Sequence, residues 1–412
     1  MPLNLSQLSP KARVNLTVLV AALGYFVDVL DTQLYPALRV ASLQSLGLAP
    51  EQVTDAGISI LNWQMMGMIL GGILWGVMGD KKGRVKVLFG SIILYSLGSI
   101  ANAFVESVEA YRVVRFFVGI GLAGEIGAGI TLISELLPKE SRGYGTTIAT
   151  ACGVAGAMGS ALIAQNMDWR SAYIVAGVLG LALLLLRISV NESGLYQTVG
   201  AKGHVVSGNF FMLFTDRTRF LRYACCILGG VPIYFFLGVF VIFAPEVGKS
   251  LEVEGNLSVA QAFVYDSVGI TIGCFACGLV SQWLRTRRSA LIGFLLCLFC
   301  LLLVMSHLKG IQPNAYYIFV FLGGFLIGYW GILVTTTAEM FGTNLRATAT
   351  ATVQNFIRSS IIPINLLIVF FKPEYGFLVS AQIVGLLCFA LAAVALWYMP
   401  ETYARDLDYV EE

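Results

Sequence analysis

Charged residues are scarce in this sequence. Only 12% of its 412 residues are Asp, Glu, Lys or Arg, while 57% are hydrophobic. A soluble domain normally has about a quarter charged residues, so the composition excludes an ordinary water-soluble fold and indicates a membrane protein. Histidine is rarer still: His204 and His307 are the only two, and both fall outside the long apolar runs.

The sequence signatures of an ATP-driven pump and of a hydrolytic enzyme are also missing. The chain has no Gly-x-x-x-x-Gly-Lys-Ser/Thr loop, the phosphate cradle expected of an ATP-driven pump, and no hydrolytic constellation. Its eight cysteines all fall in apolar stretches, where free cysteine behaves as a small hydrophobic residue. We therefore expect neither an enzyme nor a resident cofactor or metal ion.

Long apolar runs dominate the rest of the chain. Only helices or closed barrels satisfy their backbone hydrogen bonds in lipid, and the alternating pattern of a barrel strand is absent. Windows of about twenty apolar residues predict an all-α membrane protein with twelve transmembrane helices in two pseudo-symmetric six-helix bundles. The predicted spans are 14–36, 56–79, 86–105, 110–136, 144–165, 170–188, 222–246, 259–283, 288–306, 314–338, 347–371 and 376–398.

The longest hydrophilic connection divides these spans into six and six. The predicted segments are an N-terminus at 1–13, a bundle at 14–188, a linker at 189–221, a bundle at 222–398 and a tail at 399–412. The linker contains an aromatic cluster at 210–214 that predicts a short interfacial helix. Most basic residues, Arg187 among them, fall on the linker side of the spans, which predicts that the linker and both termini are cytoplasmic.

A polar signature occurs once in each half. Glu135 precedes Arg142 by seven residues, and Glu339 precedes Arg346 by the same interval. Each pair joins the end of one apolar span to the start of the next. In a membrane protein, parallel repeats of this kind usually surround a substrate path.

Further marks lie along the whole chain. They are a loop with Asp80, Gly83 and Arg84, then Arg115-Phe-Phe-Val-Gly119-Ile-Gly121, Asp168-Trp169-Arg170 and Pro400-Glu401-Thr402. In this order the chain resembles the major facilitator superfamily, whose members are twelve-helix transporters that work by alternating access. The resemblance, together with the repeated signature, implies a gate made of Asp80, Gly83, Arg84, Glu135, Arg142, Glu339 and Arg346.

The first predicted helix indicates which branch of the superfamily the chain resembles. Asp28 and Asp31 lie three residues apart, which resembles the proton-coupled metabolite and organic-acid porters of that superfamily. The fourth span, which includes Glu125, is similar to the same branch and to its organic-ion relatives. This resemblance implies a symporter.

Acidic residues at bilayer depth indicate a specific role, because placing an ionised group there costs at least about 2.5–3.5 kcal/mol of free energy. Asp28 and Asp31 share one face of a helix, and burial together with mutual repulsion favours proton uptake. A packing role as an ion pair with Arg115 is the alternative. We expect Arg115 to hold Asp31 and leave Asp28 to titrate.

Glu125 lies near the middle of the fourth span among glycines that favour close helix packing. Three roles remain open for it: a proton site, a hydrogen-bond acceptor for substrate, or a neutral carboxyl bonded across the helix seam.

Arg358 places a guanidinium near the centre of the eleventh span, one turn beyond Gln354 and Asn355. A guanidinium offers a planar fork that matches a carboxylate. We expect Arg358, Gln354 and Asn355 to bind an anionic substrate, as the resemblance to organic-ion carriers also implies. The alternative is an internal ion pair with Asp266.

Other side chains are expected to complete the substrate cavity. They are Tyr25, Tyr35, Trp63, Gln64, Tyr234, Tyr329 and Trp330.

The sequence thus predicts proton-coupled uptake of a small organic anion or metabolite. An exporter or antiporter of drugs, siderophores or cations is the alternative, and a non-transporting sensor is less consistent with the buried charges. We expect a monomer in the bacterial inner membrane, with lipid, protons and a small molecule as its partners and no nucleic acid.

Overall fold

The computed structural model describes residues 10–411 apart from 83, 137–141, 192–209, 306, 343–344 and 404–410. Of residues 10–18, 21, 79–82, 84–86, 126–136, 142–151, 154, 188–191 and 347 it describes the backbone alone. All regular elements in this part of the chain are helices. The chain divides into two compact units, Met1–Asn209 and Phe210–Glu412.

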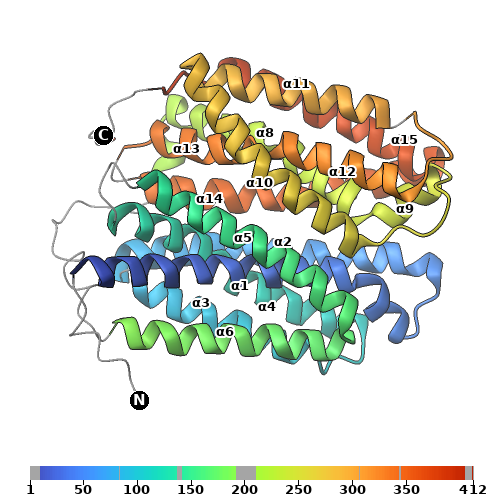
Figure 1. Cartoon of the computed structure of the whole chain (residues 1–412), viewed down its shortest axis with the longest axis horizontal. Coiled ribbons are helices and arrows are strands. Elements are labelled where there is room, and N and C mark those ends of the chain that lie inside the picture. Colours follow the sequence, from blue (N-terminus) through green and yellow to red (C-terminus); the bar gives the residue numbers. More distant parts are fainter. Residues whose placement is uncertain are drawn as a thin grey trace. The chain divides into compact units, whose positions relative to one another are not determined.

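The structure describes six helices in unit 1. They are α1 (Pro10–Ser45), α2 (Pro50–Lys82), α3 (Arg84–Asn102), α4 (Val108–Leu136), α5 (Arg142–Asn166) and α6 (Trp169–Asn191). Within the unit, α2 packs against α4, α1 against α5, and α3 against both α4 and α6 (Figure 1).

The described part of unit 2 is divided into more helical segments. They are α7 (Met212–Thr215), α8 (Arg217–Phe236), the π-helix η2 (Leu237–Ile242), α9 (Ala244–Ser250), α10 (Val259–Leu284), α11 (Arg287–Met305), α12 (Pro313–Ile327), α13 (Trp330–Met340), α14 (Arg346–Ser359) and α15 (Ile361–Tyr398). Here α10 packs against α12, α8 against α15, and α11 against α12 and α15.

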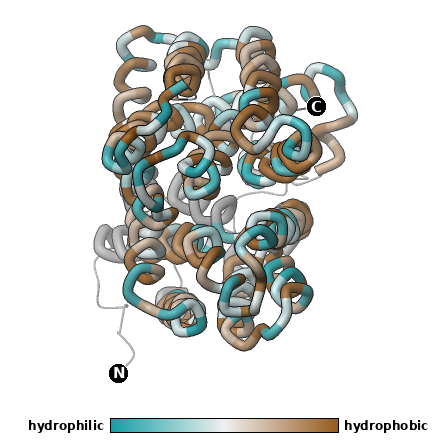
Figure 2. The backbone as a smooth tube through the Cα atoms, turned by 90° about the vertical axis from the view of Figure 1, so that its right-hand side faces the viewer, coloured by the Kyte–Doolittle hydropathy of each residue, from teal (hydrophilic) through white to brown (hydrophobic). Residues whose placement is uncertain are grey.

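Each of the twelve predicted spans falls mainly on helix, and the predicted all-α fold class is confirmed. Seven described helical stretches are long and apolar enough to cross a membrane by length and composition. Hydrophobic residues cover most of these helices, with hydrophilic ones interspersed (Figure 2).

Three spans of unit 2 are interrupted within their length. The span 222–246 passes from α8 through η2 into α9, so the π-helix lies between Pro232 and Pro245. The spans 314–338 and 347–371 break at Gly328 and Ser360. The Ser360 hydroxyl donates to the Ile357 carbonyl oxygen at 2.6 Å, and the Ser360 backbone N–H donates to the same oxygen at 3.1 Å.

The last two spans are joined without a loop. Gly376, inside α15, has φ 75° and ψ 174°. This conformation is easily reached only by a residue without a Cβ atom. One glycine therefore makes the whole connection between the eleventh and twelfth spans.

Part of the predicted linker is folded into unit 2. The short helix α7 lies where the aromatic cluster predicted one, and Phe210 and Leu213 are buried. Arg219 donates from its guanidinium to the Met212 carbonyl oxygen at 2.8 Å. The second compact unit, which begins at Phe210, thus includes this part of the predicted linker.

Glycines let helix backbones approach closely in both units. A Cβ atom on Gly67 of α2 would collide with the carbonyl of Phe116 in α4, and one on Gly273 of α10 would collide with the carbonyl of Phe325 in α12. Such small-residue seams are the usual basis of helix association in lipid.

We expect Gly273→Ala to lower the melting temperature of the purified protein in detergent, because the added methyl group must push α10 away from α12 at a cost of about 1–3 kcal/mol. Gly278→Ala on the same helix is the matched control, since nothing lies within 4 Å of the Cβ position there. That control should melt at or above the parent temperature, because alanine favours helix over glycine by about 1 kcal/mol. Equal melting of the two variants would contradict a close-packed seam.

Candidate functional site

A buried ion pair joins α1 to α4. Asp31 and Arg115 are both inaccessible to solvent, and an Arg115 terminal nitrogen lies 3.1 Å from Asp31 Oδ1. The Ser99 hydroxyl donates to the other carboxylate oxygen. Gln64 Oε1 accepts from Arg115 Nε at 3.2 Å and from its second terminal nitrogen at 2.8 Å. The pair predicted from the sequence is present, and Gln64, for which substrate binding was predicted, accepts both hydrogen bonds from Arg115.

Three buried tyrosines surround this arginine. Its Cζ atom lies 5.6 Å from the ring centroid of Tyr35 and 5.7 Å from that of Tyr173. Tyr111 and Tyr173 share a hydrogen bond of 2.6 Å, and the Tyr35 hydroxyl donates to the Gly57 carbonyl oxygen at 3.0 Å. Cation–π contacts are strongest when water is excluded, so the arginine is fixed on several sides. Tyr35 was one of the predicted cavity residues, whereas Tyr111 and Tyr173 were not predicted to surround Arg115.

A second buried ion pair joins α4 to α6. Arg187 holds Glu125 with both terminal nitrogens, one of them 3.0 Å from Glu125 Oε2. Both side chains are buried. The three roles left open for Glu125 did not include an ion pair with Arg187, which had been counted only among the basic residues of the cytoplasmic side. A carboxylate that is buried without a counter-charge destabilises the fold, and Arg187 supplies the positive charge that Glu125 needs.

Gly24 of α1 makes room for that pair. A Cβ atom at this position would collide with an Arg187 terminal nitrogen and with Glu125 Oε1. One helical turn later on the same helix lies Asp28, which is also fully buried. Asp28 therefore lies between the two ion pairs along α1, on the stretch from Gly24 to Asp31.

Arg358 lies in the last turn of α14 and is 4% exposed. A positive charge is favoured there, because the helix C-terminus carries a partial negative charge. Gln354 and Asn355 are buried beside it, and the Asn355 amide nitrogen donates to the Ala351 carbonyl oxygen at 3.2 Å. Asp266, the internal partner considered for Arg358, is buried but forms no ion pair with any residue that the structure describes.

The remaining predicted cavity residues differ in surroundings. The Tyr329 hydroxyl donates to the Gly229 carbonyl oxygen at 2.9 Å, and the ring is fully buried. Tyr329 therefore links α8 to the α12–α13 break. Trp330 is half-buried and meets Tyr234 edge to face. Trp63 is 39% exposed.

Tyr25 of α1 is half-buried and lies close to α5. A Cβ atom on Gly153 would collide with its ring. Tyr25, Tyr234 and Trp330 are half-buried and Trp63 is exposed, so these four stay the aromatic candidates for the cavity.

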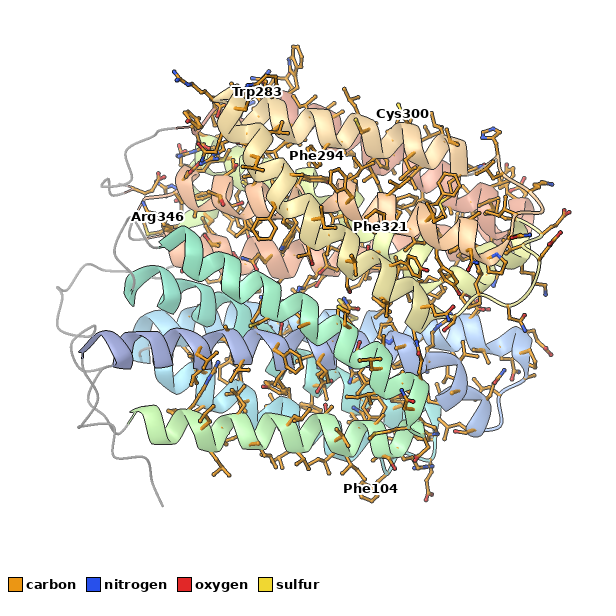
Figure 3. The ribbon with its side chains drawn as sticks, viewed as in Figure 1. Phe104, Trp283, Phe294, Cys300, Phe321 and Arg346 are labelled. Atoms are coloured by element: carbon orange, nitrogen blue, oxygen red, sulfur yellow. The ribbon has the colours of Figure 1, made fainter. Side chains whose placement is uncertain are left out.

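Among the residues predicted to form the gate, the structure describes the side chains only of those in unit 2. Glu339 of α13 lies 3.2 Å from an Arg287 terminal nitrogen at the start of α11, and the Thr402 hydroxyl donates to Glu339 at 2.7 Å. Arg346, the first residue of α14 (labelled in Figure 3), donates through Nε to the Ala338 carbonyl oxygen at 2.9 Å. Gly83 lies outside the described residues, and the side chains of Asp80, Arg84, Glu135 and Arg142 lie outside the described side chains.

Glu401 closes the same end of unit 2. Its carboxylate accepts from the backbone N–H groups of Arg287 at 2.8 Å and Arg288 at 3.2 Å, the first residues of α11. Burial raises the pKa of the Glu401 carboxyl, but these backbone donors outweigh it and hold the pKa below its ordinary value. Glu401 thus provides an acid beside the start of α11 from the C-terminal segment.

Comparison with known proteins gives consistent results. The sequence model of the Major Facilitator Superfamily matches residues 18–364. The chain is 24% identical to the niacin transporter NiaP of Acinetobacter baylyi, over 97% of both chains. It is 29% identical to the 4-hydroxybenzoate transporter PcaK of Pseudomonas putida, over 45% of this chain and 42% of that protein.

A solved structure has a similar fold. The proton:xylose symporter XylE, bound to 6-bromo-6-deoxy-D-glucose, superposes with a TM-score of 0.71 at 17% sequence identity. The match covers 97% of this chain and 98% of that one.

We expect Glu125→Gln to lower the stability of unit 1 by about 3–5 kcal/mol, because it leaves the Arg187 charge buried without its carboxylate. Thermal unfolding in detergent would measure this. Glu109→Gln on the same helix is the matched control, since Glu109 is 76% exposed and only 3.6 Å from Arg112, and exposed pairs contribute roughly 0–1 kcal/mol. The double variant Glu125→Leu/Arg187→Leu should be more stable than Glu125→Gln. If Glu125→Gln melts like Glu109→Gln, the buried pair is not a structural constraint.

Proposed function

Because the chain belongs to the Major Facilitator Superfamily, it is a multi-pass membrane transporter and not an enzyme, and we propose that it imports a small organic acid by proton symport. The substrate class that we favour is a monocyclic aromatic carboxylate. The cell would use this carrier in the bacterial inner membrane, as a monomer, with alternating access to the two sides.

Arg358 is the observation that carries the proposal. A guanidinium buried at bilayer depth is costly, and a substrate carboxylate would offset that cost through two parallel charge-assisted hydrogen bonds. Gln354 and Asn355 lie beside it and supply amide groups for a ring substituent. Trp330 is an aromatic side chain of the same unit with a partly accessible ring.

Two relatives support the aromatic acid. One is named for niacin and the other for 4-hydroxybenzoate, and each of these compounds is a single aromatic ring with one carboxylate. A site made from one arginine, amides and aromatic side chains fits that shared chemistry.

The buried acids of unit 1 support proton coupling. Asp31 is fixed by Arg115 and Ser99, so a change in its protonation would disturb several contacts at once. We therefore assign the coupling proton to Asp28, three residues earlier on α1. Glu125 is committed to Arg187 and is assigned a structural role.

The gate belongs to the same proposal. Glu339 and Arg287 tie α13 to α11 in unit 2. We assign Asp80, Gly83, Arg84, Glu135 and Arg142 the corresponding role in unit 1, on the basis of the repeated sequence signature. Breaking and remaking these ties would accompany opening toward one side of the membrane.

We expect Arg358→Lys to weaken nicotinate or 4-hydroxybenzoate binding by roughly 1–3 kcal/mol, or about tenfold or more, because lysine keeps the charge but loses the planar fork. Calorimetric titration of the purified protein would measure this. Arg222→Lys is the matched control, since that arginine binds Glu411 and the Met340 carbonyl oxygen and should leave affinity unchanged. Equal binding of the corresponding neutral amides would rule out carboxylate recognition by Arg358.

We expect Asp28→Asn to abolish proton-driven accumulation in proteoliposomes while substrate exchange continues, because an amide resembles the protonated acid but cannot release a proton. Radiolabelled uptake under an inward proton gradient, set beside counterflow without a gradient, separates the two activities. Asp31→Asn should instead reduce the folded yield, since it leaves Arg115 buried without its counter-charge. Normal accumulation by Asp28→Asn would transfer the coupling role to another group.

A further inference from the structure

Unit 2 contains a groove away from the buried charges. It lies among α8, η2, α11 and the second part of α15, and its volume is about 220 Å³. Four phenylalanine rings form one continuous wall. The ring centroid of Phe235 lies 6.2 Å from that of Phe240 and 6.3 Å from that of Phe389. The ring centroids of Phe299 and Phe389 are 5.3 Å apart. An apolar cavity of about 150 Å³ already accepts a benzene ring, so the groove holds a substantial apolar group.

Small residues on α15 give the groove its depth. Ala381 and Gly385 line it at successive turns. A Cβ atom on Gly385 would lie 2.6 Å from the Phe235 ring, so the glycine permits α15 to approach α8 and lets that ring turn into the wall.

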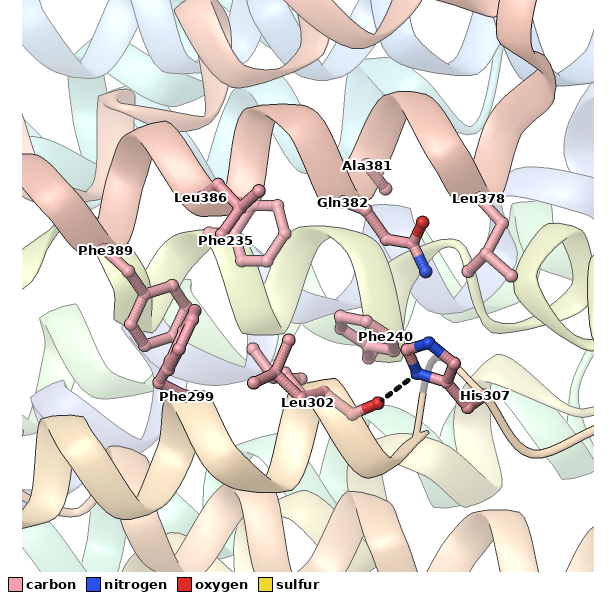
Figure 4. A pocket seen from close by; sticks show the side chains of 12 residues that line it. Phe235, Phe240, Phe299, Leu302, His307, Leu378, Ala381, Gln382, Leu386 and Phe389 are labelled. Atoms are coloured by element: carbon pink, nitrogen blue, oxygen red, sulfur yellow. Dashed lines mark hydrogen bonds between the residues drawn. The ribbon is translucent and has the colours of Figure 1, made fainter.

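The groove has one polar end. Gln382 and His307 lie together at one end, while Phe299 and Phe389 lie at the other (Figure 4). His307 follows the last residue of α11, and its Nδ1 atom is 2.7 Å from the Leu303 carbonyl oxygen. The polar end is therefore at the level where the helix ends, and the aromatic end is deeper along it.

The surface around the mouth is apolar and exposed. Leu303 and Val304 on α11 are 45% and 54% exposed, and Leu386 and Leu387 on α15 are 55% and 49% exposed. On membrane-spanning helices such a surface faces lipid, so the groove is continuous with the lipid-contacting surface of unit 2.

We propose that this groove binds one acyl chain of a phospholipid, with the head group beside His307 and Gln382. Lipid tails are as apolar as the protein side chains, so burial alone gives no preference for the groove over bulk bilayer. The preference comes from close contact with the four rings and the small-residue floor, and from hydrogen bonds between the head group and the two polar side chains. The site is independent of the substrate site at Arg358.

A photoreactive phosphatidylglycerol with a diazirine on its acyl chain tests the proposal. The full-length protein would be reconstituted in phosphatidylethanolamine and phosphatidylglycerol vesicles with this probe, and the labelled peptides mapped by mass spectrometry. We expect labelling to concentrate on the α11 and α15 residues that line the groove.

Leu303→Trp should fill the mouth and reduce this labelling by about tenfold, equivalent to about 1.4 kcal/mol. Leu296→Trp is the matched control on the same helix, because Leu296 is similarly exposed and does not line the groove; it should label like the parent. His307→Ala/Gln382→Leu, which leaves the apolar wall intact, should weaken labelling by the phospholipid more than labelling by a fatty alcohol probe.

Labelling spread evenly over the exposed leucines, or unaffected by Leu303→Trp, would overturn the proposal. Competition by 4-hydroxybenzoate at the groove would also overturn it, because the occupant would then be a small aromatic acid.

Discussion

A charge removed from water must be matched within the protein, and this constraint organises unit 1. The two arginines Arg115 and Arg187 each hold a carboxylate from another helix, and both pairs are buried. The attraction in such a pair barely offsets the cost of desolvation, so its main effect is to penalise any arrangement that separates the partners. Helices α1, α4 and α6 are thereby fixed in register, which gives Asp28 a defined position between two charged contacts.

The pairs in turn depend on residues that carry no charge. Gly24 leaves the space in which Glu125 and Arg187 meet. Gly119 of α4 lets its helix lie against the backbone at Gln64, the residue whose side-chain oxygen binds Arg115. Electrostatic and steric requirements thus meet on the same few helical turns, and substitution of a small residue there would act through the ion pairs as much as through packing.

Some of this arrangement could be predicted from the sequence. Spans were found because apolar runs of sufficient length have few alternatives in lipid, and the contact between Asp31 and Arg115 followed from the rarity of buried charge. Arg187 was missed because an arginine near the end of an apolar run looks the same whether it faces water or turns inward. The hydrogen bond of Tyr329 to Gly229 depends on the break at Gly328, and no periodic pattern marks such a break. The split of the seventh span by a π-helix was likewise hidden, since one-turn changes in hydrogen bonding leave composition unaltered.

The single-glycine connection at Gly376 has a consequence for biosynthesis. Because Gly376 is the one residue with non-helical backbone angles inside α15, we expect the eleventh and twelfth spans to insert into the bilayer together. The eleventh span carries Arg358, whose transfer into lipid is unfavourable by about 2.5–3.5 kcal/mol. The residues after Gly376 contain no charged side chain until Glu401. We therefore expect Arg358 to enter the bilayer together with the uncharged segment 377–400. A longer or more flexible connection would allow the eleventh and twelfth spans to insert separately.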